Sequence, residues 1–267
     1  MGLTLLLGAL VGAVLGLTGA GGGMLAVPAL VVGLHWSMQQ AAPVALIAVA
    51  FGAAVGAVEG LRRGLVRYRA AVCMALSGIP FSSLGQWLAH RLSQQVLLLA
   101  FSLLMLWVAQ RLWRQARAGQ EARLLPTRLG LIDPATGRFL WSPATLGLVA
   151  GIGALTGFMT GLLGVGGGFV IVPLLRRFTR LPMQGIVATS LLVIALVGGG
   201  AVLNAWWRGQ PFPAQETLLF SGATALGMLA GRRAAAHLSA RQVQQGFALV
   251  LAGVALGLML KALTSGP

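Results

Sequence analysis

Long apolar runs separated by short connections dominate the chain. Each run approaches the length of about 20 residues that an α-helix needs to cross a bilayer. A β-barrel would show shorter segments of alternating polarity, so the pattern predicts an all-α polytopic membrane protein. Seven such runs lie near residues 44–58, 70–89, 95–110, 144–163, 186–203, 214–231 and 243–260.

Two glycine-rich segments interrupt this apolar pattern, at residues 19–28 and 164–173. The first reads Gly-Ala-Gly-Gly-Gly-Met-Leu-Ala-Val-Pro and the second, 145 positions later, reads Gly-Val-Gly-Gly-Gly-Phe-Val-Ile-Val-Pro. Because each glycine costs a helix about 1 kcal/mol relative to alanine, a run of them predicts a break in the helix. Paired breaks at matching places in two halves of an apolar chain are typical of a transporter's binding site.

Close helix packing is the alternative explanation of the glycines, since small residues let membrane helices touch. It stays open for the two glycine-rich segments, although their triple glycine, their proline and their repetition favour a break. For isolated glycines such as Gly52, Gly56 and Gly227, packing is the favoured interpretation.

The repetition extends beyond the glycines and divides the chain into two halves. Each half has one glycine-broken segment, re-entrant or discontinuous, followed by three transmembrane helices. We therefore expect a first transmembrane repeat at 1–112, a cytoplasmic linker at 113–142 and a second transmembrane repeat at 143–267. The offset drifts by a residue either way among the matching pairs, which are Met38-Gln39 with Met183-Gln184, Ser77-Gly78 with Ser221-Gly222, and Leu92-Ser93 with Leu238-Ser239.

The basic residues indicate how the two halves are oriented. Cytoplasmic connections of membrane proteins carry an excess of Lys and Arg. If each glycine-broken segment returns to the side from which it entered, 16 of the 19 Lys and Arg lie on the linker side, leaving Arg91, Arg208 and Lys261 on the other. If both segments cross fully, the division is 12 to 7. The first arrangement fits better, and it predicts six full crossings, inverted repeats and both termini outside. A full crossing by the run at 144–163 stays open, because that run is long enough to span the bilayer.

Composition supports a membrane location and narrows the function. Hydrophobic residues make up 57% of the chain and charged residues 9%, against about 25% charged residues in soluble domains. A net charge of +15 would suggest nucleic acid in a soluble protein, but here the orientation signal explains the arginines better, and a basic face could also gather small anions. The single cysteine, Cys73, lies in an apolar run, and no metal-ligand spacing exists, so no metal or cofactor is expected.

The glycine breaks carry the chemistry that we expect at the site. The residues after each break, 24–30 and 169–175, begin a half-helix whose first amides are unpaired and carry the positive end of the helix dipole. Glycines let the backbone approach a ligand closely. Together these features predict one anion site between the two half-helix ends, formed by the backbone of Gly21, Gly22, Gly23, Gly166, Gly167 and Gly168.

Hydroxyl side chains near the breaks are the other candidates for anion contacts. Thr18 precedes the first break, and Thr189 and Ser190 lie in the helix after the second, where the first half has Val44 and Ala45. Hydroxyls can donate to an anion oxygen, so we include these three residues in the predicted substrate site. For Thr156 and Thr160, a hydrogen bond back to a helix carbonyl is an equally good explanation.

Acidic and nucleophilic residues do not form a catalytic set. Glu59 precedes Arg62 and Arg63 by three and four residues, and an ion pair at the membrane interface explains it better than proton coupling. No carboxylate pair, nucleophile–base pair or histidine cluster is present. The sequence therefore does not predict an enzyme.

The doubled motif Gly-x-Gly-Gly-Gly-x-x-x-Val-Pro-x-Leu, at 19–30 and 164–175, resembles the TauE/SafE family of sulfite exporters. Ala188-Thr189-Ser190-Leu191 after the second copy adds to the resemblance, which covers the whole chain. It implies a bacterial-type plasma-membrane protein that moves sulfite, sulfonates or related small oxyanions. The first half departs from the family pattern at Pro43-Val44-Ala45, where a Thr-Ser pair often stands.

The sequence as a whole predicts a secondary transporter of small sulfur-containing anions that works by alternating access. The expected location is the cell membrane, plasma or inner, and the expected partners are a small anionic substrate and the lipid bilayer, without nucleic acid. A homodimer is left open. The alternatives are a passive anion channel and a membrane partner protein that transports nothing.

Overall fold

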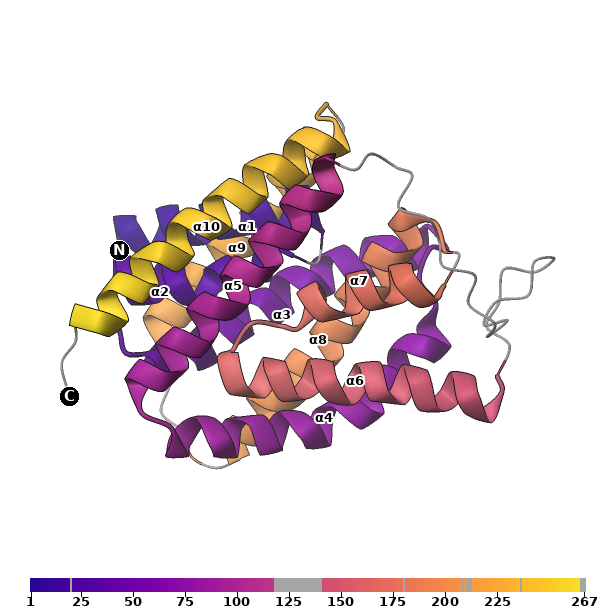
Figure 1. The fold of residues 1–267 in the computed structure, drawn as a ribbon, viewed down its shortest axis with the longest axis horizontal. Helices are drawn as coiled ribbons and strands as arrows, with labels where there is room; N and C mark the ends of the chain where they lie inside the picture. Colours follow the sequence, from indigo (N-terminus) through magenta and orange to yellow (C-terminus); the bar gives the residue numbers. More distant parts are fainter. Residues whose placement is uncertain are drawn as a thin grey trace.

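The computed structural model shows a bundle of helices (Figure 1). It describes residues 1–19, 21–117, 141–179, 181–207, 209, 213–235 and 237–264, so most of the predicted linker, residues 118–140, lies outside the described part. The first half holds α1 (Gly2–Thr18), a short 3₁₀ helix η1 (Gly22–Leu25), α2 (Ala26–Gly33), α3 (Met38–Arg62), α4 (Tyr68–Arg91) and α5 (Gln94–Arg117). The second half holds α6 (Pro143–Leu163), α7 (Gly168–Phe178), α8 (Met183–Trp207), α9 (Ala214–Ala235) and α10 (Ala240–Thr264).

In the described part of the chain, six helices are long and apolar enough to cross a membrane: α3, α4, α5, α6, α8 and α10. The prediction of an all-α polytopic membrane protein is therefore confirmed. The six expected crossings included α9 rather than α6. α9 is the more polar of the two, because it carries Glu216 in its first turn and Arg232 and Arg233 in its last.

Local sequence signals explain where several helices start. At α3, the Ser37 hydroxyl accepts from the Gln40 amide, and the Gln40 side chain accepts from the Ser37 amide, so two of the first backbone donors are satisfied. At α6, the Ser142 hydroxyl accepts from the Thr145 amide, and Pro143 occupies the first helical position, where its missing N–H costs nothing.

Both glycine breaks turn the chain back toward the end of the bundle from which it came. In the first half, a β-carbon at Gly33 would contact Leu7, so the end of α2 lies beside the start of α1. In the second half, Ile171 of α7 lies in one core cluster with Val149 and Ile152 of α6, and α7 runs back along α6 (Figure 1). Each broken segment is thus a helical hairpin, and α6 is the longer arm of its hairpin.

Glycine stripes join helices of opposite halves. Three glycines of α1 and three of α6 lie so close to a neighbouring helix that a β-carbon would collide with a backbone carbonyl oxygen. The pairs are Gly8 with Phe220, Gly12 with Thr224 and Gly16 with Met228 between α1 and α9, and Gly153 with Met74, Gly157 with Gly78 and Gly161 with Ser82 between α6 and α4. Close packing is therefore the role of these glycines, and Gly227, which meets Ala9, has the same role.

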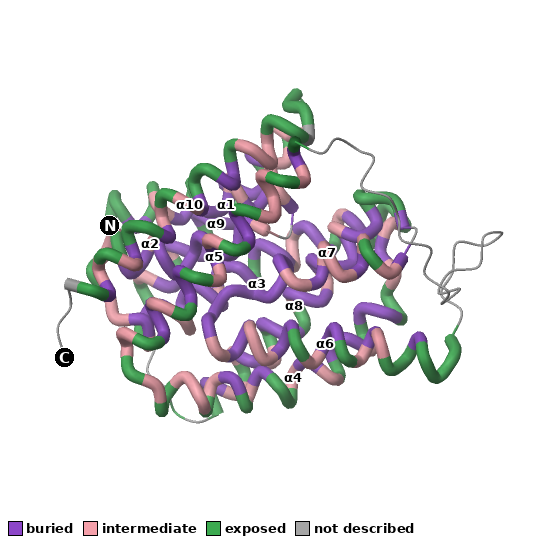
Figure 2. The backbone as a smooth tube through the Cα atoms, in the orientation of Figure 1, coloured by how far each residue is buried: buried purple, intermediate pink, exposed green. Residues whose placement is uncertain are grey.

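The packing partners of the two halves correspond. α1 packs on α9 as α6 packs on α4, α3 contacts α9 as α8 contacts α4, and α5 pairs with α10. α3 and α8 cross at the centre and are the most buried of the six spans (Figure 2). The stripes also correct the alignment, because they pair Gly78 with Thr224, at an offset of 146, rather than with Gly222. The inverted repeat stays a prediction. It requires that equivalent helices of the two halves pack on equivalent helices of the opposite half, as they do here.

Candidate functional site

The two glycine breaks meet at the centre of the bundle, beside Val49 of α3. A β-carbon at Gly23 would lie 2.9 Å from the Val49 Cγ1 and 3.4 Å from the carbonyl oxygen of Val165. A β-carbon at Gly166 would lie 2.8 Å from the same Val49 methyl group and 3.1 Å from Cγ2 of Ile194. The two breaks therefore lie next to each other. Val49 packs against both of them, and Ile194 packs against the second.

Backbone conformation explains why the second break needs glycine. Gly164 ends α6 with φ 70°, and Gly166 and Gly167 have φ 64° and 58°, in the left-handed region that side chains disfavour. A β-carbon at Gly167 would also collide with Thr156 and lie 2.8 Å from the Thr160 hydroxyl. In the described part of the first break, Gly19 has φ 79°, and the turn of η1 follows.

The helix that follows the second break, α7, begins without a side-chain cap. Its first turn is closed by bonds from the Val170 and Ile171 amides to the Gly167 carbonyl oxygen. The Gly168 and Phe169 amides donate to no described residue. Two backbone donors and the positive end of the α7 dipole are therefore available at this point.

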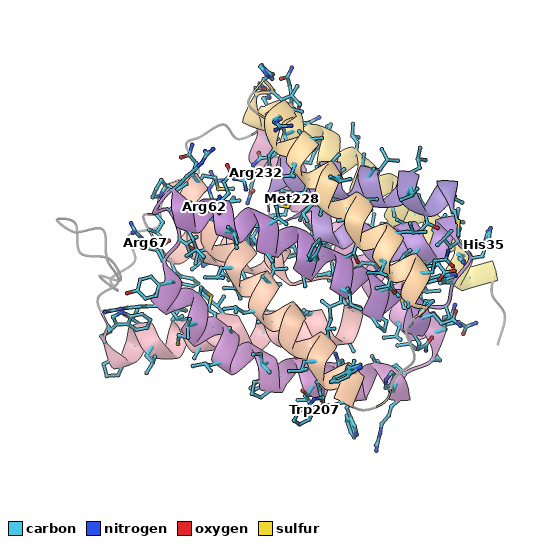
Figure 3. The ribbon with its side chains drawn as sticks, turned by 180° about the vertical axis from the view of Figure 1, so that it is seen from behind. His35, Arg62, Arg67, Trp207, Met228 and Arg232 are labelled. Carbon is cyan, nitrogen blue, oxygen red and sulfur yellow. The ribbon has the colours of Figure 1, made fainter. Side chains whose placement is uncertain are left out.

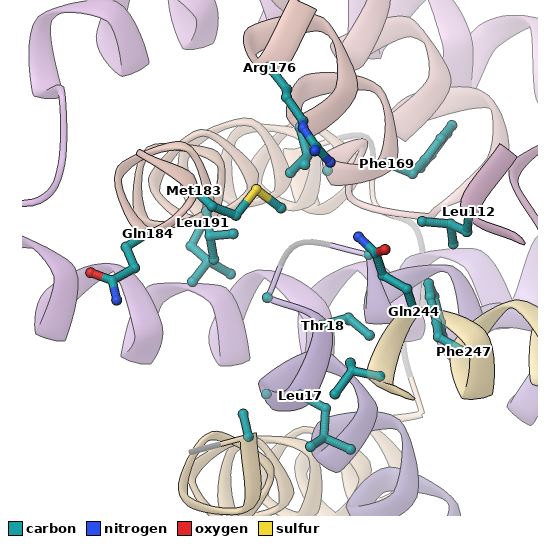
Figure 4. A pocket seen from close by; sticks show the side chains of 18 of the residues that line it. Leu17, Thr18, Leu112, Phe169, Arg176, Met183, Gln184, Leu191, Gln244 and Phe247 are labelled. Atoms are coloured by element: carbon teal, nitrogen blue, oxygen red, sulfur yellow. The ribbon is translucent and has the colours of Figure 1, made fainter. Parts of the chain in front are cut away.

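A cavity of about 480 Å³ reaches both breaks from one end of the bundle. One face of α7 lines it, through Phe169, Val172, Pro173 and Arg176, which recur at helical spacing. Figure 4 shows Arg176 pointing from α7 into this space, opposite Thr18 and Gln244. The cavity is thus apolar along its walls and polar near its mouth.

Among the described residues, four arginines line the cavity: Arg63, Arg111, Arg176 and Arg232. No acidic residue is among the described residues that line it. Glu59 lies nearby and pairs with Arg63 at 2.7 Å and with Arg232 at 2.9 Å. Arg176 makes no ion pair or hydrogen bond with any described residue. One carboxylate against four guanidinium groups leaves an excess of positive charge, which attracts anions.

The arginine end of the bundle is opposite the end that holds His35. Arg62, Arg67 and Arg232 lie together, away from His35 (Figure 3). Of the two expected partners of Glu59, Arg63 forms the ion pair and Arg62 does not, and Glu59 also pairs with Arg232. The pairing with Arg232 links α3 to α9. A second contact between the same helices is the hydrogen bond that an Arg232 N–H donates to the Gly56 carbonyl oxygen at 3.3 Å.

The structure distributes the predicted site residues over the cavity and the layer behind it. Thr18, Gly21 and Gly168 line the cavity. Gly22, Gly23, Gly166 and Gly167 are buried and form the breaks themselves without lining it. The Thr18 hydroxyl donates to the Val14 carbonyl oxygen at 2.7 Å.

Thr189 and Ser190 do not line the cavity, and both hydroxyls are used within the protein. The Thr189 hydroxyl accepts from the Arg67 amide at 3.0 Å, which satisfies a donor at the start of α4. The Ser190 hydroxyl donates to the Ile186 carbonyl oxygen at 2.8 Å. A direct contact of either residue with an anion stays a prediction.

Sequence reasoning missed the arginines as lining residues. They were interpreted mainly as an orientation signal, and the anion-gathering basic face that was also considered was not assigned to particular arginines. The spacing could have found Arg176, because it follows Phe169 by seven residues and so shares its helix face. Among the described residues, no three His, Cys, Asp or Glu side chains gather closely enough to hold a metal ion.

A second, much smaller cavity of about 40 Å³ approaches the breaks from the opposite end of the bundle. Gly164 and Thr160 line it near the break, and Gln39, Gln86 and His90 line it farther out. Between the two cavities lie Val165, Gly166 and Gly167, together with the fully buried Val49 and Ile194. The large cavity is therefore closed at its inner end.

Comparison with known proteins identifies the family of this arrangement. The family model "Sulfite exporter TauE/SafE" matches residues 4–258. The chain belongs to the TauE/SafE family. The glycine breaks that meet at the centre are thus features of a TauE/SafE protein, and the resemblance seen in the doubled motif is confirmed.

Similar proteins are named as membrane transporters. The chain is 33% identical over 199 residues, 74% of this chain and 70% of the relative, to a "Probable membrane transporter protein" of Xylella fastidiosa strain 9a5c. It is 26% identical over 202 residues, 71% of this chain and 72% of the relative, to the "Probable membrane transporter protein YunE" of Bacillus subtilis strain 168. No solved structure matches. The TauE/SafE protein described here is therefore a multi-pass membrane transporter.

Proposed function

We propose that this transporter moves small sulfur-containing anions, such as sulfite, sulfonates or related oxyanions, by alternating access. The observation that carries the proposal is the cavity of about 480 Å³, lined by four arginines, that ends at the two glycine breaks. Anion attraction at the mouth and backbone donors at the inner end suit a small oxyanion. The name of the matching family supports sulfite and its relatives as the substrate class.

The substrate binds, in this proposal, where the large cavity meets the start of α7. Gly168 and Phe169, whose amides are uncapped, lie at this point, Thr18 lines the cavity as well, and Arg176 lies two turns farther along the same helix. An anion that enters past the arginines keeps favourable charge contacts until it reaches the backbone donors. The apolar walls formed by Phe169, Val172 and Phe247 exclude part of its water shell.

Alternating access explains a cavity that is open at one end and closed at the other. Val49 and Ile194 close the path behind the breaks, and an apolar constriction of this kind keeps ions from passing. A passive channel would need a continuous polar path, so the closed layer favours a carrier. The arginine end and the linker at 113–142 face the cytoplasm, and both termini face outward, in line with the excess of basic residues at that end.

The deciding experiment measures anion uptake into proteoliposomes that contain the purified full chain. Sulfite, a short alkyl sulfonate, sulfate and chloride are compared with protein-free liposomes. Saturable uptake of sulfite or sulfonate supports the proposal. Uptake that does not saturate, together with single-channel currents in planar bilayers, would establish a channel instead, and no uptake of any of the four anions would contradict the substrate class.

Arg176→Gln tests whether the cavity binds the anion. We expect the half-saturating concentration to rise at least about tenfold, because a charge-assisted contact contributes roughly 1.5–3 kcal/mol. Arg177→Gln is the matched control, because Arg177 is the next residue of α7, is exposed and does not line the cavity. Equal effects of the two substitutions would remove Arg176 from the path.

A further inference from the structure

The two cavities are lined by residues that correspond between the two halves of the chain. At the repeat offset of 145, residues of the large cavity match residues of the small one, although one cavity measures about 480 Å³ and the other about 40 Å³. The matching pairs include Met183 with Met38, Gln184 with Gln39, and Leu191 with Leu46. We propose that the small cavity is the collapsed counterpart of the large one, and that it opens when the two halves exchange conformations. The inference rests on the proposed alternating access.

The same correspondence extends to the hairpins. Gly16 and Gly19, at the end of α1, line the large cavity, and Gly161 and Gly164, at the end of α6, line the small one. Each cavity is thus bounded by the first arm of one hairpin and by the helix that follows the other hairpin. Two cavities built from equivalent parts and differing in volume are what a repeat protein shows when it is open on one side.

Two polar clamps occupy equivalent places. At the arginine end, Arg232 of α9 donates to the Gly56 carbonyl oxygen at 3.3 Å and pairs with Glu59 at 2.9 Å. At the opposite end, Gln86 of α4 donates to the Ala201 carbonyl oxygen at 3.2 Å and accepts from Asn204 at 3.5 Å. Ala201 and Asn204 follow Gly56 and Glu59 by 145 residues. The two ends of the bundle therefore share one design, with charges at one end and amides at the other.

The closed layer between the two cavities lies at the axis that relates the two halves of the chain. Val49 and Ile194 are themselves 145 residues apart, and both contact Gly166. Residues that lie next to their own counterparts mark the axis that relates the halves. The closed layer is therefore common to both states, and the cavities open on alternate sides of it.

The second helices of the two hairpins, α2 and α7, differ in exposure, as a bundle that is open on one side requires. On α7, Val172 and Pro173 line the large cavity and are partly exposed. The equivalent face of α2 is closed: Val27 is 0% exposed, and the Val31 carbonyl oxygen accepts from Lys261 Nζ at 2.7 Å. In the second state, α2 presents this face to the enlarged far cavity while α7 packs away.

The second state has a different chemistry at its mouth. Val31 stands where α7 has Arg176, and Gln86 stands where α9 has Arg232. Amides hold an anion less strongly than guanidinium groups do. The anion is therefore held at the arginine end and released at the opposite end, which favours loading from the arginine side.

Thiol accessibility tests the exchange without any known substrate. In a Cys73→Ser background, Val172→Cys and Val27→Cys are placed one at a time in the full chain, in membrane vesicles of both orientations. A membrane-impermeant maleimide is applied from either side. We expect Val172→Cys to react from the arginine side. Val27→Cys should react from the opposite side at least about tenfold faster than a buried control, because minor states of this kind reach up to 10% of the population.

Val193→Cys is that control, because Val193 is also 0% exposed but lies in the core cluster of Val149, Ile152 and Ile171 and lines neither cavity. Leu191→Cys and Leu46→Cys repeat the comparison on α8 and α3, so that one misfolded variant leaves a second pair. Val27→Cys and Leu46→Cys that react no faster than Val193→Cys would overturn the exchange.

The accessibility result separates this inference from the proposed function. If no anion is transported but the cysteines react on opposite sides as expected, the exchange stands and the substrate class fails. If sulfite or a sulfonate is transported while Val27→Cys and Leu46→Cys stay unreactive, the transporter assignment stands and the exchange of the halves fails.

Discussion

Thr156 and Thr160 have similar positions, one turn apart on α6, and different roles. The Thr160 hydroxyl donates to the Thr156 carbonyl oxygen at 2.8 Å. The Thr156 hydroxyl is fully buried beside Gly167 and has no hydrogen-bond partner among the described residues. A buried hydroxyl without a partner costs about 1–3 kcal/mol, so a residue that keeps one invites a functional explanation.

Thr156→Val should therefore change stability and transport in opposite directions. The valine has nearly the same shape and removes the unpaired hydroxyl, so we expect the thermal unfolding temperature in detergent to rise. Transport of sulfite should weaken if the hydroxyl donates to the bound anion. Thr160→Val is the matched control, since it removes a hydrogen bond worth about 0.5–1.5 kcal/mol and should lower the unfolding temperature. A lower unfolding temperature for Thr156→Val would show that its hydroxyl is satisfied in the membrane.

At the residue scale, the sequence could predict candidates but not their use. It placed Thr18, Thr189 and Ser190 near the breaks, and all three hydroxyls bond within the protein. A hydroxyl's partner depends on which helix lies opposite, as with the Arg67 amide that reaches Thr189 across 122 positions of the chain. That information is absent from local spacing.

Among the elements, the second hairpin depends on a few left-handed glycines. Gly167 immediately precedes α7 as its N-cap, and its φ of 58° and its contact with Thr156 both exclude a side chain. Gly151, in the middle of α6, is exposed, and a β-carbon there would meet nothing within 4 Å. The same residue type thus has opposite roles within one hairpin.

Gly167→Ala and Gly151→Ala should accordingly have opposite effects. We expect Gly167→Ala to lower stability by about 1–3 kcal/mol, the cost of a strained backbone, and to abolish sulfite uptake because the start of α7 moves. Gly151→Ala should raise stability by up to about 1 kcal/mol, since it replaces glycine inside a helix, with uptake unchanged. Thermal unfolding of the two variants in detergent measures the contrast, and equal shifts would mean that the break tolerates a side chain.

The sequence was most informative about the helices and the breaks between them. The apolar runs predicted the long helices, and the doubled glycine motif predicted both breaks. It could not show that one face of α7 is open while the equivalent face of α2 is closed, because the two motifs are nearly identical. Under the proposed alternating access, which hairpin is open depends on the conformational state, and a motif shared by both halves carries no information about that state.

For the whole molecule, the sorting of charge predicts the sidedness of the protein. The turn between α4 and α5 contains Ser93, and the turn between α9 and α10 contains Ser239, and both residues are exposed. These serines correspond at an offset of 146. Inverted halves place them on opposite sides of the membrane, whereas parallel halves place them on the same side.

Ser93→Cys and Ser239→Cys, each in a Cys73→Ser background, test this arrangement in intact cells. We expect an impermeant maleimide to label Ser93→Cys directly and to label Ser239→Cys only after permeabilisation. The reason is that Arg232, Arg233 and Arg241 surround the second turn, and basic turns stay in the cytoplasm. Labelling of both cysteines in intact cells would contradict the inverted arrangement.

The layer formed by Val49, Ile194 and the glycine breaks has an electrical consequence. The large cavity opens at one end of the bundle and ends at this layer. When water fills the cavity, the membrane potential falls mainly over the closed stretch that remains. One elementary charge that crosses the membrane exchanges about 2.3 kcal/mol per 100 mV with the field. Movement of an uncompensated monovalent anion should therefore carry current, and its rate should vary steeply with voltage.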